Sequence, residues 1–592
     1  MKLLICSLVI FANISNNIKA SIDSIIPTNA NILFEDNLRN PDKSCYRPCK
    51  FNVKPRICIY NFKIEPIVQE NGKAIIAING ISPGPPIHVC VNDIIVVEVH
   101  NKIPDEDVAI HWHGVEQKGT PYMDGVPMVT QCPIGYGSRY RYAFKASSPG
   151  TYFYHSDSVS HQSDGVFGVL TVSQPQPLDP NSNLYDYDRT MENTLLVSAS
   201  FKKLLTGNLG DSTSLKPISI KINGEANNFK MFVMSGFAYR LRLINAIAVE
   251  CPIVIYIDGH ELVVISTDGK PVKPVSARKV KLYPGERMDV VVRASQKSGG
   301  YWLRSIGKDS CKGLNTRAMF LYSGFNYTSM LDQEEKRIVD DEFDSDTVYG
   351  QILESLQDVS FNTEAEKVYL GVDRNIVRFK EDDNDFRYIS DVMKRKPFFP
   401  SFLETQGNGV VQVNGKNFLY PNSPLLLMAD QLQNKCNVGE EDEKHDLQCV
   451  QVLNTEKGKV LEIALVNEGF GSNDSYTFHM HGYSMQVVSM WKNPKNNPIS
   501  RQQFHEMDRN GKVKRNLQNP VLKDTVIVPN KGFTIVRIRT ENGGSWILEC
   551  RSCGLFSLPA AIIINVPQFI PHSIITSLPK CGNYRPPDVL LN

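Results

Sequence analysis

Short apolar runs separated by glycine, proline and polar turns make up most of the chain from about residue 56 onward. Runs such as AIIAING, DIIVVEVHN and GVLTV are rich in β-branched residues and are too short for ordinary helices. This pattern is typical of strands in a Greek-key β-sandwich or barrel. The sequence therefore predicts an all-β protein.

One arrangement of these runs occurs three times, as a glycine, an aromatic strand, a polar turn and a closing apolar strand. The copies are PGTYFYHSDSVSHQSDGVFGVLTV (149–172), SGGYWLRSIGKDSCKGLNTRAMFLY (298–322) and NGGSWILECRSCGLFSLPAAIIINV (542–566). A matching strand precedes each copy, namely VCVNDIIVVEVHN, FVMSGFAYRLRLINA and KGKVLEIALVNEG. Such repetition predicts tandem domains of one kind. We place three β-domains at 56–178, 190–325 and 412–570.

The remaining segments lack this repeated pattern of strands and turns. Residues 21–55 predict an extended arm pinned by its cysteines, and residues 326–411 predict a surface linker with little secondary structure, acidic at first and mixed afterwards. Residues 571–592 form a polar C-terminal tail. The linker could alternatively bind a partner.

Near the N-terminus, Lys2 precedes the apolar run Leu3–Ala12, which is followed by a short polar stretch ending at Ala20. This predicts a secretory signal peptide at 1–20. No later run approaches the roughly 18 apolar residues that a membrane span needs. A formal net charge of +1 gives no field that favours nucleic acid. We therefore expect a secreted, extracellular protein with no membrane span and no nucleic-acid partner.

Cysteine use agrees with that compartment. Thirteen cysteines less Cys6 in the signal leave twelve, an even number best explained by disulfides, although pairing does not follow from sequence. We expect structural disulfide bridges within Cys45 to Cys58, between Cys90 and Cys132, and between Cys436 and Cys449. Sequons at Asn326 and Asn473 predict a glycoprotein.

Three short motifs carry candidate chemistry. Alternate residues of a strand point to one face, so three pairs project together: His111 with His113, His155 with Asp157, and His479 with His481. Imidazole pairs suit copper, zinc, iron or nickel. Because the pairs belong to the first and third domains, they can converge only if an intact interface joins those domains.

Several long stretches identify a family. INGISPGPPIHVC, AIHWHGVEQKGTPYMDGVPMVTQCPI, TYFYHSDSVSHQSDGVFG, PNSPLL, FHMHGYSMQVV and LKDTVIVPNKGFTIVRIR resemble the multicopper oxidases, most closely the laccase-like enzymes of insects. The resemblance implies three cupredoxin domains and copper cofactors. It also implies a type 1 copper that takes electrons from a substrate and a trinuclear cluster that reduces dioxygen to water.

The resemblance assigns five imidazoles to the trinuclear cluster. These are His111 and His479 at the type 2 copper, His113 and His155 at the first type 3 copper, and His481 at the second. Three cluster positions depart from the family, because Arg551, Asp157 and Glu549 stand where imidazoles are expected.

The type 1 positions depart further. They hold Tyr476, Cys550, Leu555 and Ala560, where the family has His, Cys, His and an axial Met or aliphatic residue. Cys550 is the only remnant ligand, and a site of two histidines and one cysteine cannot be assembled from it. Cys553 lies three residues on, and a disulfide between the two would remove that thiolate.

Arg551 places a permanent cation where copper is expected, and it cannot become a ligand. We expect a bidentate ion pair with Asp157 or Glu549 in place of metal charge. Alternatively, His481 with Asp157 and Glu549 could hold one zinc, manganese or iron ion. Asp124 falls where the family has an acid that assists proton delivery, and a turn aspartate before glycine is the alternative. His161, His260, His445, His505 and His572 match no ligand position and are expected on the surface or in loops.

The sequence thus favours a secreted laccase-like homologue whose copper complement is reduced or lost, and which is non-catalytic or only binds metal. We expect it to bind an unknown extracellular partner or a small phenolic ligand. One alternative is an active copper oxidase of phenols, catechols or ferrous iron. The other is a single-metal, type 2-like copper or zinc protein.

Overall fold

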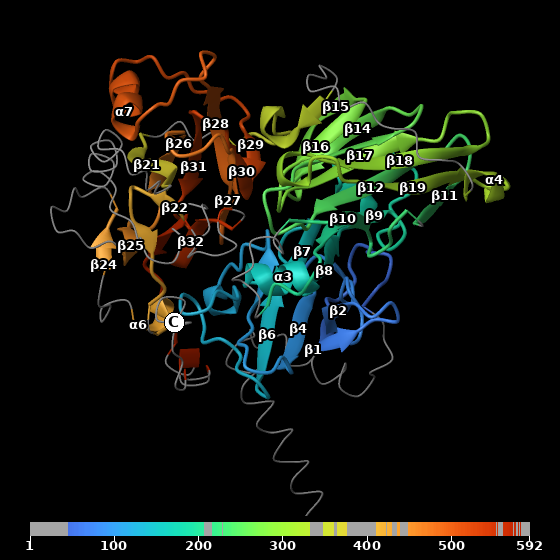
Figure 1. Cartoon of the computed structure of the whole chain (residues 1–592), viewed down its shortest axis with the longest axis horizontal. Coiled ribbons are helices and arrows are strands. Elements are labelled where there is room, and N and C mark those ends of the chain that lie inside the picture. The colour runs from blue at the N-terminus through green and yellow to red at the C-terminus, as the bar shows by residue number, and fades with distance from the viewer. Residues whose placement is uncertain are drawn as a thin grey trace, which may run out of the picture.

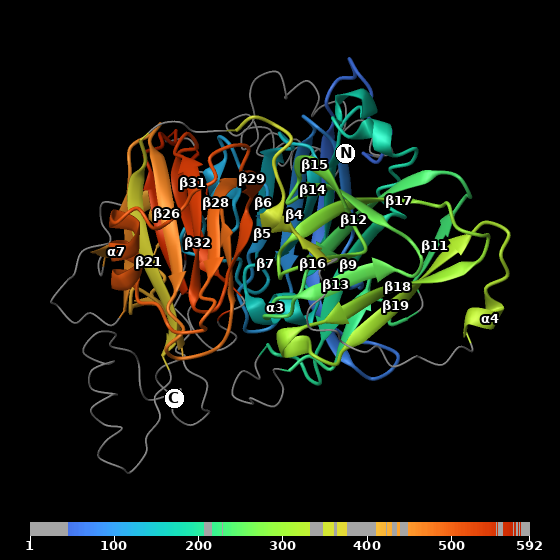
Figure 2. The ribbon, with the colours of Figure 1, turned by 90° about the horizontal axis from the view of Figure 1, so that it is seen from above.

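The computed structural model describes residues 45–206, 216–227, 229–331, 347–359, 364–375, 410–421, 423–428, 435–438, 448–551, 553, 560–571, 574–575, 578 and 581. The predicted signal peptide and most of the predicted tail lie outside this part of the chain. Within it, the strands form six sheets grouped in three successive pairs, which make three lobes (Figures 1 and 2). The predicted all-β architecture of three tandem domains is confirmed.

The first lobe has two four-stranded sheets, with strand orders β2-β1-β4-β6 and β3-β8-β7-β5. Side chains from both sheets meet in one apolar core. The strands are β1 Ile57–Val68, β2 Ala74–Ile78, β3 Ile87–Cys90, β4 Ile94–Asn101, β5 Ile110–His113, β6 Arg139–Lys145, β7 Gly150–Ser156 and β8 Phe167–Ser173.

The second lobe has two six-stranded sheets, ordered β10-β9-β12-β17-β14-β15 and β11-β19-β18-β13-β16-β20. Its strands are β9 Thr194–Ser200, β10 Ser219–Ile222, β11 Lys230–Val233, β12 Ala238–Asn245, β13 Ile253–Ile257, β14 Leu262–Thr267, β15 Lys270–Ala277, β16 Lys279–Leu282, β17 Arg287–Arg293, β18 Gly300–Gly307, β19 Asn315–Tyr322 and β20 Thr347–Tyr349.

The third lobe has the orders β22-β21-β26-β31-β28-β29 and β23-β25-β33-β32-β27-β30, with β24 beside β25. Its strands are β21 Glu366–Asn375, β22 Val410–Val413, β23 Asn417–Phe418, β24 Lys435–Asn437, β25 Gln448–Asn454, β26 Val460–Asn467, β27 Tyr476–Met480, β28 Met485–Lys492, β29 Val521–Lys523, β30 Thr525–Val528, β31 Gly532–Arg539, β32 Gly544–Cys550 and β33 Ala560–Val566.

The helices of the described residues are short. They are α3 Val159–Asp164, α4 Thr328–Leu331, α6 Leu425–Met428 and α7 Arg501–Arg509, with 3-10 turns η1 Pro121–Met123, η2 Gln176–Leu178, η3 Ser182–Leu184, η5 Asp309–Cys311 and η6 Gly350–Ile352. None of the helices in the described part of the chain is long and apolar enough to cross a membrane.

The three repeated stretches form equivalent hairpins, since β7 pairs with β8, β18 with β19 and β32 with β33, each antiparallel. The linker prediction for 326–411 is wrong where strands occur in it. β20 pairs with β16 of the second lobe, and β21 pairs along its length with β26 of the third. The domain boundaries themselves stay predictions.

The twelve cysteines predicted to form disulfides do so. The pairs are Cys45–Cys58, Cys49–Cys90, Cys132–Cys581, Cys251–Cys311, Cys436–Cys449 and Cys550–Cys553. The predicted bridge of Cys90 with Cys132 is therefore wrong. Cys132 instead ties the first lobe to a cysteine 449 residues further along the chain.

Candidate metal centre

Strand β5 directs the first histidine pair away from the core of its own lobe. Ile110 and Trp112 belong to that core, so period-two alternation turns His111 and His113 to the opposite face. His155 on β7 pairs directly across the sheet from His111 and shares that face. Three imidazoles therefore project from the same face of this sheet, away from the core of the first lobe.

Strands β27 and β32 present the matching surface of the third lobe. Phe478 and Met480 enter its core, so His479 points outward, and Glu549 on β32 pairs directly opposite it. Gly482, which ends the second histidine motif, has a φ of +74°, and a Cβ there would collide with the Trp546 ring. Only glycine fits that turn without strain.

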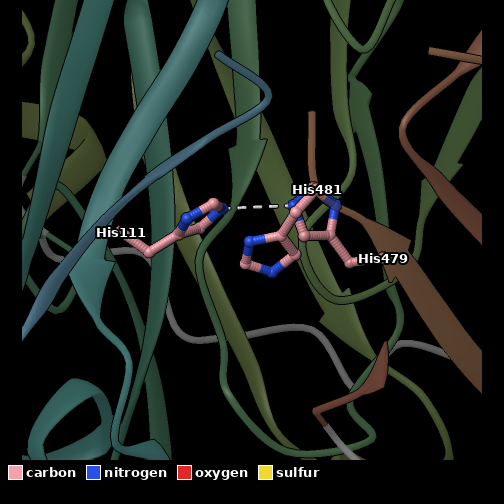
Figure 3. A group of neighbouring side chains, drawn as sticks. All are labelled: His111, His479 and His481. Atoms are coloured by element: carbon pink, nitrogen blue, oxygen red, sulfur yellow. Dashed lines mark hydrogen bonds between the residues drawn. The ribbon is translucent and has the colours of Figure 1, made fainter. Parts of the chain in front are cut away.

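His111 and His479 meet across the interface between the first and third lobes (Figure 3). Their Nε2 atoms lie 3.2 Å apart, and the His481 ring lies 3.9 Å from that of His111. All three side chains are buried. The interface between the first and third domains that convergence of the histidine pairs requires is therefore present.

Hydrogen bonds fix the tautomers of the first two rings. The Nδ1 of His111 lies 2.8 Å from the carbonyl oxygen of Asp124, and that of His479 lies 3.1 Å from the carbonyl of Asp524. A carbonyl only accepts, so each Nδ1 donates. Burial is the main cause that lowers both pKa values, to about 4 for His479, so the rings are neutral at pH 7. Two bare Nε2 lone pairs consequently face each other.

The second group joins His113 to His155. The Nδ1 of His113 lies 3.2 Å from the Nε2 of His155, whose own Nδ1 donates to the carbonyl of Ser156. On its other side, His113 Nε2 lies 3.0 Å from the hydroxyl of Thr525. Burial lowers the pKa of both imidazoles well below the ordinary value. These rings are neutral and hydrogen-bonded to each other.

His481 differs from the other four imidazoles because carboxylates flank both of its nitrogens. Its Nδ1 lies 2.8 Å from Asp124, and its Nε2 lies 3.5 Å from Glu549. Burial disfavours the charged ring, yet the charge of Asp124, followed by that of Glu549, raises the pKa of His481 to about 9. A ring protonated on both nitrogens has no lone pair to offer a metal.

Arg551 lies between the two substituted acids. Its Nη1 is 3.4 Å from Glu549 and 3.5 Å from Asp157, and its Nη2 donates to the Ser156 carbonyl and the Gln162 side chain. The expected ion pair is thus present with both carboxylates, although the bidentate geometry is not, because one nitrogen serves the two acids.

The two acids respond in opposite directions. Burial, reinforced by the charge of Glu549, raises the pKa of Asp157 to about 7. Burial would also raise that of Glu549, but the hydrogen bond from His481 and the charge of Arg551 lower it to about 2. Glu549 is therefore ionised at neutral pH, and Asp157 is partly protonated.

The type 1 positions are part of an apolar core. Tyr476, Cys550, Cys553 and Ala560 belong to one hydrophobic cluster, and the Tyr476 hydroxyl bonds to Ser472 at 2.8 Å. Cys550 is held in its disulfide with Cys553, so it offers no thiolate. Leu555 lies outside the described residues.

Copper fits these residues at only one of the expected places. The type 1 position offers one disulfide sulfur and no imidazole among its described residues. Both type 3 positions are occupied by cations, Arg551 and the charged ring of His481. By contrast, His111 and His479 present two bare nitrogens 3.2 Å apart, and these two residues would hold a single metal ion.

Three combinations of described residues bring possible ligand atoms within 4.8 Å of one another: His111, His479 and His481; His111, His113 and His155; and His113, His479 and Asp524. The predicted set of His481, Asp157 and Glu549 is not among them, because Arg551 separates the two acids. Asp524 was missed. Its signal was a charged pair, Lys523-Asp524, inside the apolar run VLKDTVIV.

The histidines outside the motifs are placed only partly as predicted. His161 is buried in α3, 3.3 Å from Glu106, so its placement on the surface or in a loop was wrong. His260 lies in the loop between β13 and β14, as predicted, but it is buried there, 3.0 Å from the Tyr322 hydroxyl. His505 lies exposed on α7, as expected. His445 and His572 lie outside the described residues.

Comparison with known proteins gives one consistent result. Three family models, each described as multicopper oxidase, match residues 63–177, 192–324 and 419–552. Laccase-1 of Botryotinia fuckeliana is 27% identical over 479 residues, covering 80% of this chain and 75% of the relative. L-ascorbate oxidase of Cucumis sativus is 25% identical over 554 residues, covering 84% and 86%.

Solved structures share the fold. The multicopper oxidase Fet3p, which functions in iron import, superposes with a TM-score of 0.70 at 20% identity, covering 88% of this chain and 94% of its own. The laccase from Botrytis aclada superposes with a TM-score of 0.67 at 21% identity, covering 88% and 93%.

Proposed function

This chain belongs to the multicopper oxidase family, and from that premise we propose that it is a secreted, laccase-like relative that does not oxidise phenols. Its role is to bind an extracellular partner or a small phenolic ligand, with few or no copper ions. The family's copper chemistry requires electrons to enter at a type 1 site, and Tyr476, the Cys550–Cys553 disulfide and Ala560 support the loss of that entry.

One observation carries the proposal. Arg551 lies 3.4 and 3.5 Å from Glu549 and Asp157, at the place where the family resemblance expects a copper-ligating imidazole. A copper ion brought beside a guanidinium would meet electrostatic repulsion in a buried, weakly screened site. The protein's own cations, Arg551 and His481, supply the positive charge that metals supply elsewhere in the family.

The compartment rests on separate observations. The N-terminal signal pattern and six disulfides support export to an oxidising environment. The sequon residue Asn326 is exposed, which would leave it accessible for glycosylation.

Metal content per chain tests the proposal. The secreted protein, expressed with copper, zinc, manganese and iron supplied and then dialysed, is expected to hold no more than one ion, and to consume no oxygen with a phenol or ferrous iron. Three or four coppers per chain would contradict it, because the substituted residues would then be acting as ligands.

A single-ion protein is the second candidate, favoured by the facing Nε2 atoms of His111 and His479. In this case one copper or zinc ion would supply a Lewis acid at a buried interface. The substitutions His111→Ala and His479→Ala should each abolish metal binding measured by titration, whereas His505→Ala on the exposed face of α7 should leave it unchanged. Equal binding by all three variants would exclude this candidate.

A further inference from the structure

A hollow lies between the first and second lobes. It has a volume of about 60 Å³. Residues of β2, α3, β9 and β10, which are labelled in Figure 1, line it. Its lining includes Lys73, Lys203 and Lys221 among serines and apolar side chains. Three ammonium groups are therefore gathered around one small hollow.

Two of these lysines lack a carboxylate partner. Among the described residues, no acid lies within ion-pair distance of the Lys73 or Lys221 ammonium group. Burial, followed by the charge of Lys221, lowers the pKa of Lys73, although Asp164 opposes the shift. The two cations therefore repel each other across the hollow, an arrangement that a bound anion would relieve.

The neutral groups of the lining agree with an anion. The hydroxyl of Ser163 is buried and makes no hydrogen bond to any described residue. Asp164 is the one acid in the lining, and its two oxygens already accept the backbone N–H groups of Leu205 and Thr206, each at 2.8 Å. The Ser163 hydroxyl is thus available to donate a hydrogen bond to an anion, while the Asp164 carboxylate is already bonded to backbone N–H groups.

We propose that this hollow, with Lys73, Lys221 and Ser163, is a binding site for a tetrahedral oxyanion, sulfate or phosphate, either free or as an ester. A water molecule needs roughly 10–15 Å³ of such volume, so the hollow accommodates about four to six heavy atoms, and a tetrahedral oxyanion has five. Its two negative charges match the two unpaired ammonium groups. The site is independent of whether any metal binds.

Thermal unfolding and calorimetry of the full secreted chain test the site. Sulfate and phosphate should raise the melting temperature more than chloride at the same ionic strength. The double variant Lys73→Met/Lys221→Met should weaken sulfate binding at least tenfold. It should still fold, with an unliganded melting temperature equal to or above that of the wild type, because a like-charge pair has been removed. The pair Lys145→Met/Lys512→Met, both exposed elsewhere, should behave as the wild type.

The single variant Lys73→Gln tests the same site if the double variant misfolds. It should weaken sulfate binding at least threefold. Phenyl phosphate and phenyl sulfate distinguish the source of the oxyanion. Tighter binding of the esters supports a ligand-borne group, and binding of the inorganic ions alone supports a free ion. Equal stabilisation by sulfate and chloride, or unchanged sulfate affinity in both lysine variants, would overturn the proposal.

Discussion

A guanidinium keeps its positive charge at every pH in which a protein is folded, and Arg551 places that charge beside Asp157 and Glu549. Around it, the charged ring of His481 lies between Asp124 and Glu549. Cations and carboxylates therefore alternate through the buried centre. Each charge is stable there only because of its neighbours, so single substitutions should have large effects.

Replacing Arg551 with methionine should destabilise the fold by about 3–5 kcal/mol at pH 7.5, because breaking a buried pair leaves uncompensated carboxylates. Urea denaturation measures the change. The double variant Arg551→Met/Glu549→Gln should recover part of the loss, and Arg509→Met, at an exposed position on α7, should change stability by less than about 0.5 kcal/mol. An unaffected Arg551→Met protein would show that these charges do not support one another.

His481 should make stability depend on pH above neutrality. Its pKa is raised from 6.5 to about 9 in the folded protein, so its contribution is fully present below pH 6.5 and is lost as pH rises through 9. The free energy of unfolding should fall by roughly 1 kcal/mol per pH unit across this window. Comparison of denaturation curves at pH 6.5 and 9 should show a clearly smaller fall in His481→Gln. Parallel curves for the two proteins would mean that this ring is neutral.

At the scale of elements, one strand, β32, supplies residues to both groups of positions that the family resemblance assigns to copper. β32 turns Cys550 into the apolar core and Glu549 toward the histidines, and Arg551 follows at its end. Substitutions on its two faces therefore affect the type 1 and the type 3 positions separately. β27 divides in the same way, with Tyr476 in the core and His479 at the centre.

Under the proposed function, oxidase activity should accordingly appear only when substitutions are made at both the type 1 and the type 3 positions. The set Tyr476→His, Asp157→His, Glu549→His, Arg551→His and Leu555→His, with Cys553→Ser to free the Cys550 thiol, is expected to gain copper and consume oxygen with a phenol. The same set without Cys553→Ser should lack a type 1 site and remain inactive. Turnover from any smaller set, measured with an oxygen electrode, would contradict the account.

The sequence predicted the elements better than their partners. Alternation and repetition along the chain were sufficient for the three hairpins and for the faces that carry His111 and His479. β21 was missed because its short run EKVYLGVDRN stands between polar segments and is stabilised by pairing with β26, nearly a hundred residues away. The partner of Cys132 and the role of Asp524 also depend on distant contacts that only the folded chain brings together.

At the scale of the whole molecule, Arg287 joins all three lobes. It belongs to β17 of the second lobe and is fully buried. Its Nη1 donates to Asp524 of the third lobe at 2.7 Å, and its Nε donates to the carbonyl of Thr151 in the first at 3.2 Å. Asp524 in turn lies 3.4 Å from the Nδ1 of His479. The placement of the central histidines thus depends on contacts between lobes.

Loss of Arg287 should therefore uncouple the lobes as well as weaken them. Arg287→Met leaves the buried carboxylate of Asp524 without the guanidinium that neutralises it, at an expected cost of about 3–5 kcal/mol. Scanning calorimetry should show an early transition of the third lobe that separates from the rest, where the wild type unfolds in fewer, overlapping steps. Arg304→Met, which removes a pair with the half-exposed Asp258 inside the second lobe, should cost no more than about 1 kcal/mol and leave the shape of the trace unchanged. If both variants give the same trace, the interface between the second and third lobes is held by its remaining contacts, such as the Lys523–Asp268 pair at 2.8 Å, and Arg287 is not what couples them.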